Sequence, residues 1–387
     1  MELITFNNFI SLIVVFVSWI LVIFLLSAKT KNKVNNILLS LFLLVNAQDS
    51  SGIFASYFIY PTHPGWGMFL NSTVFLKLPL LYLYFQSVIY SDFKLQKKHL
   101  LHLIPFLLNF IVFIPGYYSL DFNAKWEFLE NVNRNKSFEI RYSYISIHIQ
   151  IIVYIVMSYS LVNKYKTLLL ENFSNTNLLN YNWLFNLITI FAIETFLATL
   201  KNIFLFAETS KSYTYSLRIT GVFALFFISW IVLKALHNPE IFRGVNSNLQ
   251  LVRYLVIEEM QDPSETDHKT KEIDEIVNLK KYMIEKEPFL NDSLTINDLS
   301  NQMNIPVKKL SLLINRSLNQ HFFDFINSYR IKKAMEILKD PSKKSLTILE
   351  ILYEVGFNSK SSFNTAFKNY THLTPTEYRK KLLKSAP

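Results

Sequence analysis

Long runs of apolar residues fill most of the first 238 positions, and each run is long enough to cross a membrane as a helix. Seven such runs are predicted to span the bilayer, at 9–26, 34–60, 74–90, 101–120, 144–162, 183–206 and 219–236. The first run is followed by Lys29, Lys31 and Lys33. A cleavable signal peptide carries its basic residues before the apolar run, so this first run is predicted to be a retained span.

The basic residues of the short loops predict how these spans are oriented. Lysines follow the first and third spans, whereas the loop 61–73 after the second span has no Lys or Arg. The positive-inside rule therefore places the amino terminus outside and the first and third loops in the cytoplasm. The fourth loop, 121–141, carries four basic residues and runs against this pattern. Seven crossings deliver the carboxy-terminal part of the chain to the cytoplasm.

Beyond residue 238 the apolar positions recur at the spacing of short amphipathic helices. Helices are predicted at 271–286, 295–303, 307–318, 322–338, 347–355 and 358–370, and a last helix begins at Thr374. None of the apolar runs resembles a β-barrel strand. The predicted fold class is all-α: a seven-transmembrane-helix bundle followed by an α-helical domain.

Two of the predicted helix pairs have the pattern of a helix-turn-helix unit. In the second pair Thr347 and Glu350 form a capping box, and Gly356 stands where the chain leaves the helix with positive φ. In the first pair a capping box joins Thr295 and Asp298, and Asn304 occupies the turn because asparagine tolerates the left-handed conformation. The long helix at 322–338 would join the two units and fix their spacing.

Composition adds charge and excludes several kinds of site. The chain has 387 residues, a formal net charge of +10 and no cysteine, which rules out disulfides and thiolate zinc sites. Residues 294–387 hold 15 Lys and Arg against 7 Asp and Glu, a net charge of +8. The preceding stretch 244–292 has 6 Lys and Arg against 11 Asp and Glu, a net charge of −5 typical of a solvated connector. A small basic domain suits a nucleic-acid partner.

The carboxy-terminal pattern resembles the AraC-type transcriptional regulators. The resemblance rests on Gly356-Phe-Asn-Ser359, Phe367-Lys368 and Thr374-Pro-Thr-Glu377, and it covers about residues 295–383. It implies a DNA-binding domain with two helix-turn-helix units joined by a long helix. The DNA contacts that it implies are Lys308, Lys309, Ser311 and Leu312 in the first unit and Lys360, Ser361, Thr365 and Lys368 in the second. The sequence departs from the family at Asn319, Leu352 and His372.

Several ionisable residues lie inside the predicted spans, where an unpaired charge is costly. They are Asp49, Lys77, His148, Glu194 and Lys201. In the predicted topology nearly all of them fall in the outer half of the bilayer, where they could form a ligand pocket open to the outside. A salt-bridge network between helices explains the same residues. The sequence leaves both interpretations open, and it predicts no metal site and no cofactor.

These patterns predict a bacterial plasma-membrane protein with its amino terminus outside. The domains would be a transmembrane region at 1–238, a cytoplasmic linker at 239–270 and a DNA-binding domain at 271–387. The function would be sequence-specific regulation of transcription, with double-stranded DNA, the lipid bilayer and an unknown small-molecule or protein signal as partners and a homodimer as one candidate assembly. The alternative is a membrane anchor or transporter-like bundle with a basic protein- or lipid-binding tail. No enzyme is predicted, because the carboxylate pair Glu258-Glu259 lacks the histidines of a metalloprotease.

Overall fold

The computed structural model describes residues 6–27, 33–90, 92–131, 133–175, 181–237 and 268–385. The chain forms two compact units, one of residues 1–162 with 180–247 and the other of residues 163–179 with 248–387. Apart from isolated bridges, every regular element among the described residues is a helix, as the sequence predicts.

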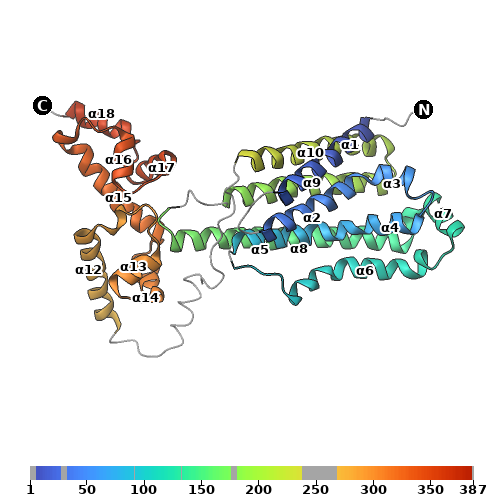
Figure 1. Ribbon diagram of the computed structural model, residues 1–387, viewed down its shortest axis with the longest axis horizontal. Coiled ribbons are helices and arrows are strands. Elements are labelled where there is room, and N and C mark those ends of the chain that lie inside the picture. The colour runs from blue at the N-terminus through green and yellow to red at the C-terminus, as the bar shows by residue number, and fades with distance from the viewer. Residues whose placement is uncertain are drawn as a thin grey trace. The chain divides into compact units, whose positions relative to one another are not determined.

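The first unit consists mainly of long helices that lie side by side (Figure 1). It contains α1 (Phe6–Ser27), α2 (Lys33–Ser50), α3 (Gly52–Phe58), α4 (Pro64–Ser72), η1 (Thr73–Leu76), α5 (Lys77–Ile89), η2 (Lys97–Leu103), α6 (Ile104–Phe113), η3 (Ile114–Tyr118), α7 (Phe122–Glu130), η4 (Arg134–Lys136), α8 (Phe138–Asn172), α9 (Tyr181–Phe206) and α10 (Ser210–His237). Only the part of α8 up to Val162 belongs to this unit.

Six helices or helix runs among the described residues are long and apolar enough to cross a membrane. They are Phe6–Ser27, Pro64–Ile89, Lys97–Tyr118, Phe138–Asn172, Tyr181–Phe206 and Ser210–Lys234. The predicted span at 34–60 is absent from this set. It corresponds to α2 and α3, and α2 packs between α1 and α5 with Asn35, Asn36 and Asn46 buried. A helix shielded by its neighbours can carry such polar side chains, which lowers its hydropathy.

The outer surface of these helices is rich in exposed large apolar side chains. Phe16 on α1, Ile152 on α8 and Phe196 on α9 each expose more than 60% of their surface. Monomeric soluble proteins seldom expose contiguous apolar patches of this kind, so the surface is suited to an apolar surrounding such as lipid.

The second unit contains the short helices of the carboxy-terminal region. They are α12 (His268–Lys286), η5 (Pro288–Leu290), α13 (Ile296–Met303), α14 (Val307–Leu312), the π-helical turn η6 (Leu313–Ser317), α15 (Phe322–Lys339), η7 (Pro341–Lys343), α16 (Ile348–Glu354), α17 (Lys360–Thr371) and α18 (Pro375–Ser385). Each helix predicted beyond residue 270 is therefore present. The predicted helix at 307–318 is divided into α14 and η6.

Helix α15 supplies side chains to two separate apolar cores. Its amino-terminal half contributes Phe322, Phe325 and Ile326 to a core shared with α12, α13 and α14. Its second half contributes residues 331–338 to a core shared with α16, α17 and α18. Figure 1 shows α15 running between the two groups of helices, so it is the rigid connector that the sequence predicts.

Candidate nucleic-acid interface

The second helix pair, α16 and α17, has a capping box at the start of α16 and one glycine in the turn between the two helices. A carboxylate oxygen of Glu350 accepts from the backbone N–H of Thr347 at 2.7 Å, and the Thr347 hydroxyl accepts from the backbone N–H of Glu350 at 3.1 Å. These bonds hold the pKa of Glu350 below its ordinary value. Gly356 then adopts a φ of +85°, and a Cβ at this position would lie 2.6 Å from the carbonyl oxygen of Phe289. The predicted capping box and the predicted positive φ are confirmed.

Phe357 fixes the angle between the two helices. Its ring is 4% exposed and meets the ring of Phe363 on α17 edge-on, with 5.2 Å between the centroids. Phe363 and Phe367 bury one face of α17 against α15, α16 and α18. The opposite face of α17 is therefore directed to solvent.

The four residues predicted to contact DNA from α17 share that solvent-exposed face. They are Lys360, Ser361, Thr365 and Lys368, and all four are exposed. Ser361, Thr365 and Lys368 follow Lys360 by one, five and eight residues, which places all four within about two fifths of the helix circumference. Hydroxyls and ammonium groups on one helix face can donate hydrogen bonds to base edges and to phosphate oxygens.

The first helix pair has the same design with a different turn residue. Thr295 and Asp298 form the predicted capping box at the start of α13, and the backbone N–H of Thr295 donates to Asp298 at 2.9 Å. Asn304 ends α13 with a φ of +54°, which confirms the prediction that asparagine takes the glycine position. Helix α14 follows and is the candidate recognition helix of this unit.

The four residues predicted to contact DNA from α14 divide into two pairs. Lys308 and Lys309 are exposed, and Lys309 forms an ion pair with Glu275 on α12. Ser311 and Leu312 are buried, each with 7% of its surface exposed. In this conformation Ser311 and Leu312 face the protein interior, so a contact between them and DNA stays a prediction that requires this face to open.

The turn and helix geometry agrees with the result of comparing the sequence with known families. A family model described as "Helix-turn-helix domain" matches residues 299–381. These residues form a helix-turn-helix domain of the AraC type. The AraC-type domain accounts for about a fifth of the chain, since the match does not extend into the apolar helices.

Two curated proteins are similar to part of the chain. The Msm operon regulatory protein of Streptococcus mutans is 31% identical over 106 residues, which are 27% of this chain and 36% of that protein. The uncharacterized HTH-type transcriptional regulator YdeC of Bacillus subtilis is 28% identical over 89 residues, which are 23% of this chain and 30% of that protein. The chain thus spans about a third of the length of these relatives.

A solved structure is also similar to part of the chain. The C-terminal domain of AraT, a response regulator from Geobacillus stearothermophilus, is 28% identical to this chain. The match covers 27% of this chain and 84% of that chain, with a TM-score of 0.24.

Two departures from the family pattern lie in left-handed backbone. Asn319 and His372 stand where the resemblance implies glycine, and their φ values are +49° and +61°. Among residues other than glycine, asparagine and histidine both occur more often than most in this conformation. The AraC-type domain therefore keeps the glycine geometry at both positions with a different side chain.

Two residues that build the domain were not predicted from the sequence. Arg330 in the middle of α15 is 1% exposed and donates hydrogen bonds to five oxygens. Glu275 pairs with Lys309 across 34 positions of the chain. The only sequence signal for Arg330 was its place on the buried side of the predicted long helix, next to Tyr329 and Ile331.

In the first unit, three of the five predicted intramembrane residues form one cluster. The ammonium group of Lys77 on α5 lies 3.3 Å from a carboxylate oxygen of Asp49 on α2 and 3.6 Å from one of Glu194 on α9. Lys201 lies two turns after Glu194 on the same helix. The ring of His148 contacts the carbonyl oxygen of Tyr144 on its own helix at 2.5 Å. Among the described residues, no ion pair joins Lys201 or His148 to the cluster.

Two pockets lie in this unit, one small and one open. A pocket of about 60 Å³ lies beside Asp49 and is lined also by Tyr60 and Asn71. This volume fits only one or two waters, whereas small-molecule sites usually enclose several hundred Å³. The contacts therefore favour an interhelical ionic network over a ligand pocket in this conformation. Among the described residues, no group of three or more His, Asp or Glu could hold a metal ion.

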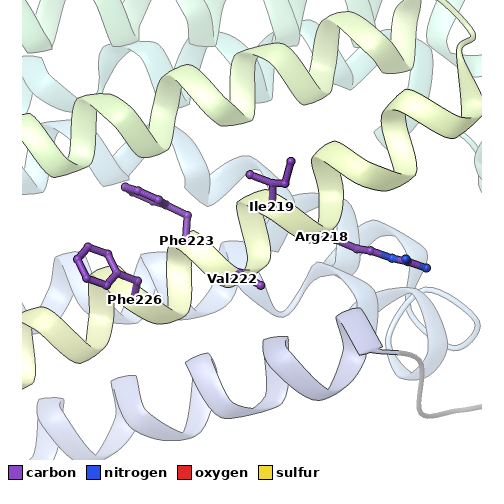
Figure 2. A pocket seen from close by; sticks show the side chains of 5 residues that line it. All are labelled: Arg218, Ile219, Val222, Phe223 and Phe226. Atoms are coloured by element: carbon purple, nitrogen blue, oxygen red, sulfur yellow. The ribbon is translucent and has the colours of Figure 1, made fainter.

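A larger hollow of about 360 Å³ lies along α10. Figure 2 shows that all of its lining side chains project from this one helix, from Arg218 to Phe226. A shallow apolar furrow on a single exposed helix offers no converging polar groups that would orient a ligand. We assign no site to it.

Proposed function

We propose that this chain is a membrane-embedded, sequence-specific DNA-binding regulator of transcription. The observation that carries the proposal is the exposed face of α17, with Lys360, Ser361, Thr365 and Lys368 on the second helix of a helix-turn-helix unit. The basic charge of residues 294–387 supports it, since neutralising phosphates releases counterions and favours binding. In the proposed complex Ser361 and Thr365 contact base edges, while Lys360 and Lys368 contact phosphates.

The proposed location is the bacterial plasma membrane, with the amino terminus outside. The six apolar helix runs and their exposed phenylalanines and isoleucines support embedding in lipid, and α2 is proposed as a seventh, shielded span. Helices α9 and α10 separate the end of α8 from the start of the carboxy-terminal region. Two spans return the chain to the same side, so both segments are proposed to lie on one side of the membrane. With the amino terminus outside, that side is the cytoplasm when α2 makes the seventh crossing.

The proposed division of the chain is a transmembrane region at 1–238, a linker at 239–270 and the DNA-binding domain at 271–387. The linker lies almost wholly outside the described residues. Residues 163–179 do not follow this division, because they cluster with the carboxy-terminal unit.

The proposal includes a homodimer as the assembly state. Helix α12 exposes Ile273, Val277 and Ile284 along one side, each with more than half of its surface open. Their spacing of four and seven residues is typical of the seam between two paired helices. A dimer would present two copies of the DNA-binding domain to one promoter.

The signal is proposed to act on the helices that the ion cluster ties together. Lys77 is nearly buried between Asp49 and Glu194, and one carboxylate oxygen of Glu194 is buried without a hydrogen-bond partner. Removing one partner from such a buried pair leaves an uncompensated charge, so the cluster holds α2, α5 and α9 in one arrangement. A small molecule or protein that alters this arrangement would be the input.

The proposal is tested by DNA binding of the full-length chain. Promoter fragments are first identified by immunoprecipitation of the chain from intact cells. The binding of the full-length chain to these fragments is then compared with its binding to scrambled fragments of equal composition. Thr365→Ala is expected to lower the preference for the promoter by roughly 5- to 150-fold, because a base contact is lost. Lys360→Glu is expected to weaken binding to both fragments, because Lys360 is proposed to contact phosphate, which is the same in both.

The matched control is Lys281→Glu, which makes the same charge reversal on the exposed side of α12. It is expected to change binding much less than Lys360→Glu. Equal binding of the unaltered chain to promoter and scrambled DNA would favour the alternative function, a membrane anchor or transporter-like bundle with a basic protein- or lipid-binding tail.

A further inference from the structure

We infer that the residues directly after α8, Phe173–Asn175, dock on the AraC-type domain and make α8 the element that couples the apolar helices to DNA binding. The docking stands on contacts within the second unit. The coupling rests on the proposed function, because it is read out as promoter binding.

The first contact is a short antiparallel pairing. Phe173 forms an isolated β-bridge with Thr295, and the backbone N–H of Ser174 donates to the carbonyl oxygen of Leu294 at 3.2 Å. Thr295 is the residue that caps α13, so the segment is attached at the start of the first helix-turn-helix unit.

The second contact is with Arg330, whose guanidinium group is completely enclosed. Its N–H groups donate to the carbonyl oxygens of Phe289 at 2.7 Å and Asn291 at 2.7 Å and to the side chain of Asn327 at 3.2 Å. The remaining two bonds go to Ser174, one to its carbonyl oxygen and one to its hydroxyl, both at 3.1 Å. Ser174 is itself 1% exposed.

These bonds make Ser174 a necessary partner of a buried charge. Burial lowers the pKa of Arg330 to about 10, so the group stays protonated at neutral pH. All five hydrogen-bond acceptors are uncharged oxygens, and removal of Ser174 would leave two donors of a buried cation without a partner. Such a loss is unfavourable, so the domain and the segment are expected to stay together rather than separate freely.

The position of Arg330 links the docked segment to both helix-turn-helix units. Arg330 lies at the middle of α15, between the two apolar cores that hold the two helix-turn-helix units. Its guanidinium also lies over the ring of Phe357, 5.4 Å from the centroid, at the turn before α17. One side chain therefore contacts the docked segment, the connector and the second turn.

Helix α8 is the element that carries the segment. It is one continuous helix from Phe138 to Asn172, and its residues belong to the apolar unit up to Val162 and to the carboxy-terminal unit after it. In the second part Tyr165, Leu168 and Leu169 are buried to 98% or more. A rotation or shift of α8 would therefore move the segment that Arg330 holds.

The docking is tested by a disulfide in the full-length chain in native membranes. The hydrogen bond joins the residues beside the bridge, so Phe173 and Thr295 form a non-hydrogen-bonded antiparallel pair with Cα atoms about 4.5 Å apart. This distance suits a disulfide, and the chain has no other cysteine. The pair Phe173→Cys with Thr295→Cys is expected to oxidise nearly completely, measured as loss of maleimide labelling.

The control pair is Thr167→Cys with Thr295→Cys. Thr167 lies about 9 Å back along α8 from Phe173, so this pair is expected to stay reduced. Equal oxidation of both pairs, or oxidation of neither, would overturn the docking.

The coupling is tested by Ser174→Pro, which removes the N–H that bonds to Leu294. Promoter occupancy of the full-length chain in cells is expected to change by about fivefold or more, the size of a typical coupling free energy. Thr167→Ala, on the last part of α8, is expected to leave occupancy unchanged.

The failure of this inference differs from failure of the proposed function. A cross-link at Phe173→Cys with unchanged occupancy in Ser174→Pro would overturn the coupling and leave DNA binding intact. Absence of occupancy by the unaltered chain would overturn the proposed function and the coupling with it, and the disulfide would still decide the docking.

Discussion

At the scale of single residues, the left-handed positions determine where the helices of the AraC-type domain end. Asn304, Asn319, Gly356 and His372 all have positive φ, and each lies at or next to the end of a helix. Gly356 also packs its α-carbon against neighbouring backbone, beside the carbonyl oxygens of Phe289 and Leu290. The glycine is therefore required at this turn for space as well as for conformation.

Gly356→Ala is expected to destabilise the second helix-turn-helix unit. The new Cβ would lie 2.6 Å from one backbone oxygen and 2.7 Å from another, and the positive φ adds strain of about 1–3 kcal/mol. Hydrogen exchange of the full-length chain should show faster exchange of the amides of α16 and α17. Gly52→Ala is the control because its Cβ would meet no atom within 4 Å. Unchanged protection in Gly356→Ala would show that the turn relaxes without cost.

Local signals were the ones that the sequence could predict. The capping boxes and the positive φ at Gly356 and Asn304 depend on residues at most four positions apart, so a short pattern contains them. Arg330 and Glu275 depend on partners 156 and 34 positions away, which no local pattern contains. Burial of Ser311 and Leu312 likewise depends on packing, because a helical period alone does not identify every side that is covered.

At the scale of helices, the two candidate recognition helices differ. Helix α17 has 12 residues and an open polar face, whereas α14 has 6 residues, continues into a π-helical turn and exposes only Lys308 and Lys309 of its predicted DNA contacts. The sequence predicted both helices and DNA contacts on each of them. The structure supports α17 as the stronger candidate for reading bases.

Glu275→Gln is expected to tighten DNA binding of the full-length chain. Glu275 on α12 pairs with Lys309, so a phosphate can bind Lys309 only after that pair opens. Exposed pairs are worth up to about 1 kcal/mol, which corresponds to at most about fivefold in affinity. The effect should shrink as salt rises.

The matched control for this change is Glu285→Gln, which removes the same charge from the same helix but breaks a pair with Lys281. Titration of labelled promoter DNA measures both variants. Equal tightening by the two variants would mean that net charge, rather than release of Lys309, causes the effect.

At the scale of the whole molecule, an apolar helical region and a basic AraC-type domain occur in one chain. The sequence predicted both regions because each covers many residues with one repeated pattern. It could not predict that residues 163–179 belong with the carboxy-terminal unit, because α8 is continuous and its buried end resembles any amphipathic helix. The central claim is that the DNA-binding domain works in the cytoplasm while the apolar helices are held in the membrane.

The most direct test of this claim is a topology reporter fused behind Pro387 of the full-length chain in bacterial cells. The account predicts that a fluorescent protein matures at the membrane and that alkaline phosphatase, which folds only after export, is inactive at the same position. An active phosphatase with a dark fluorescent protein would place the domain outside the cytoplasm, away from DNA, and would contradict the account.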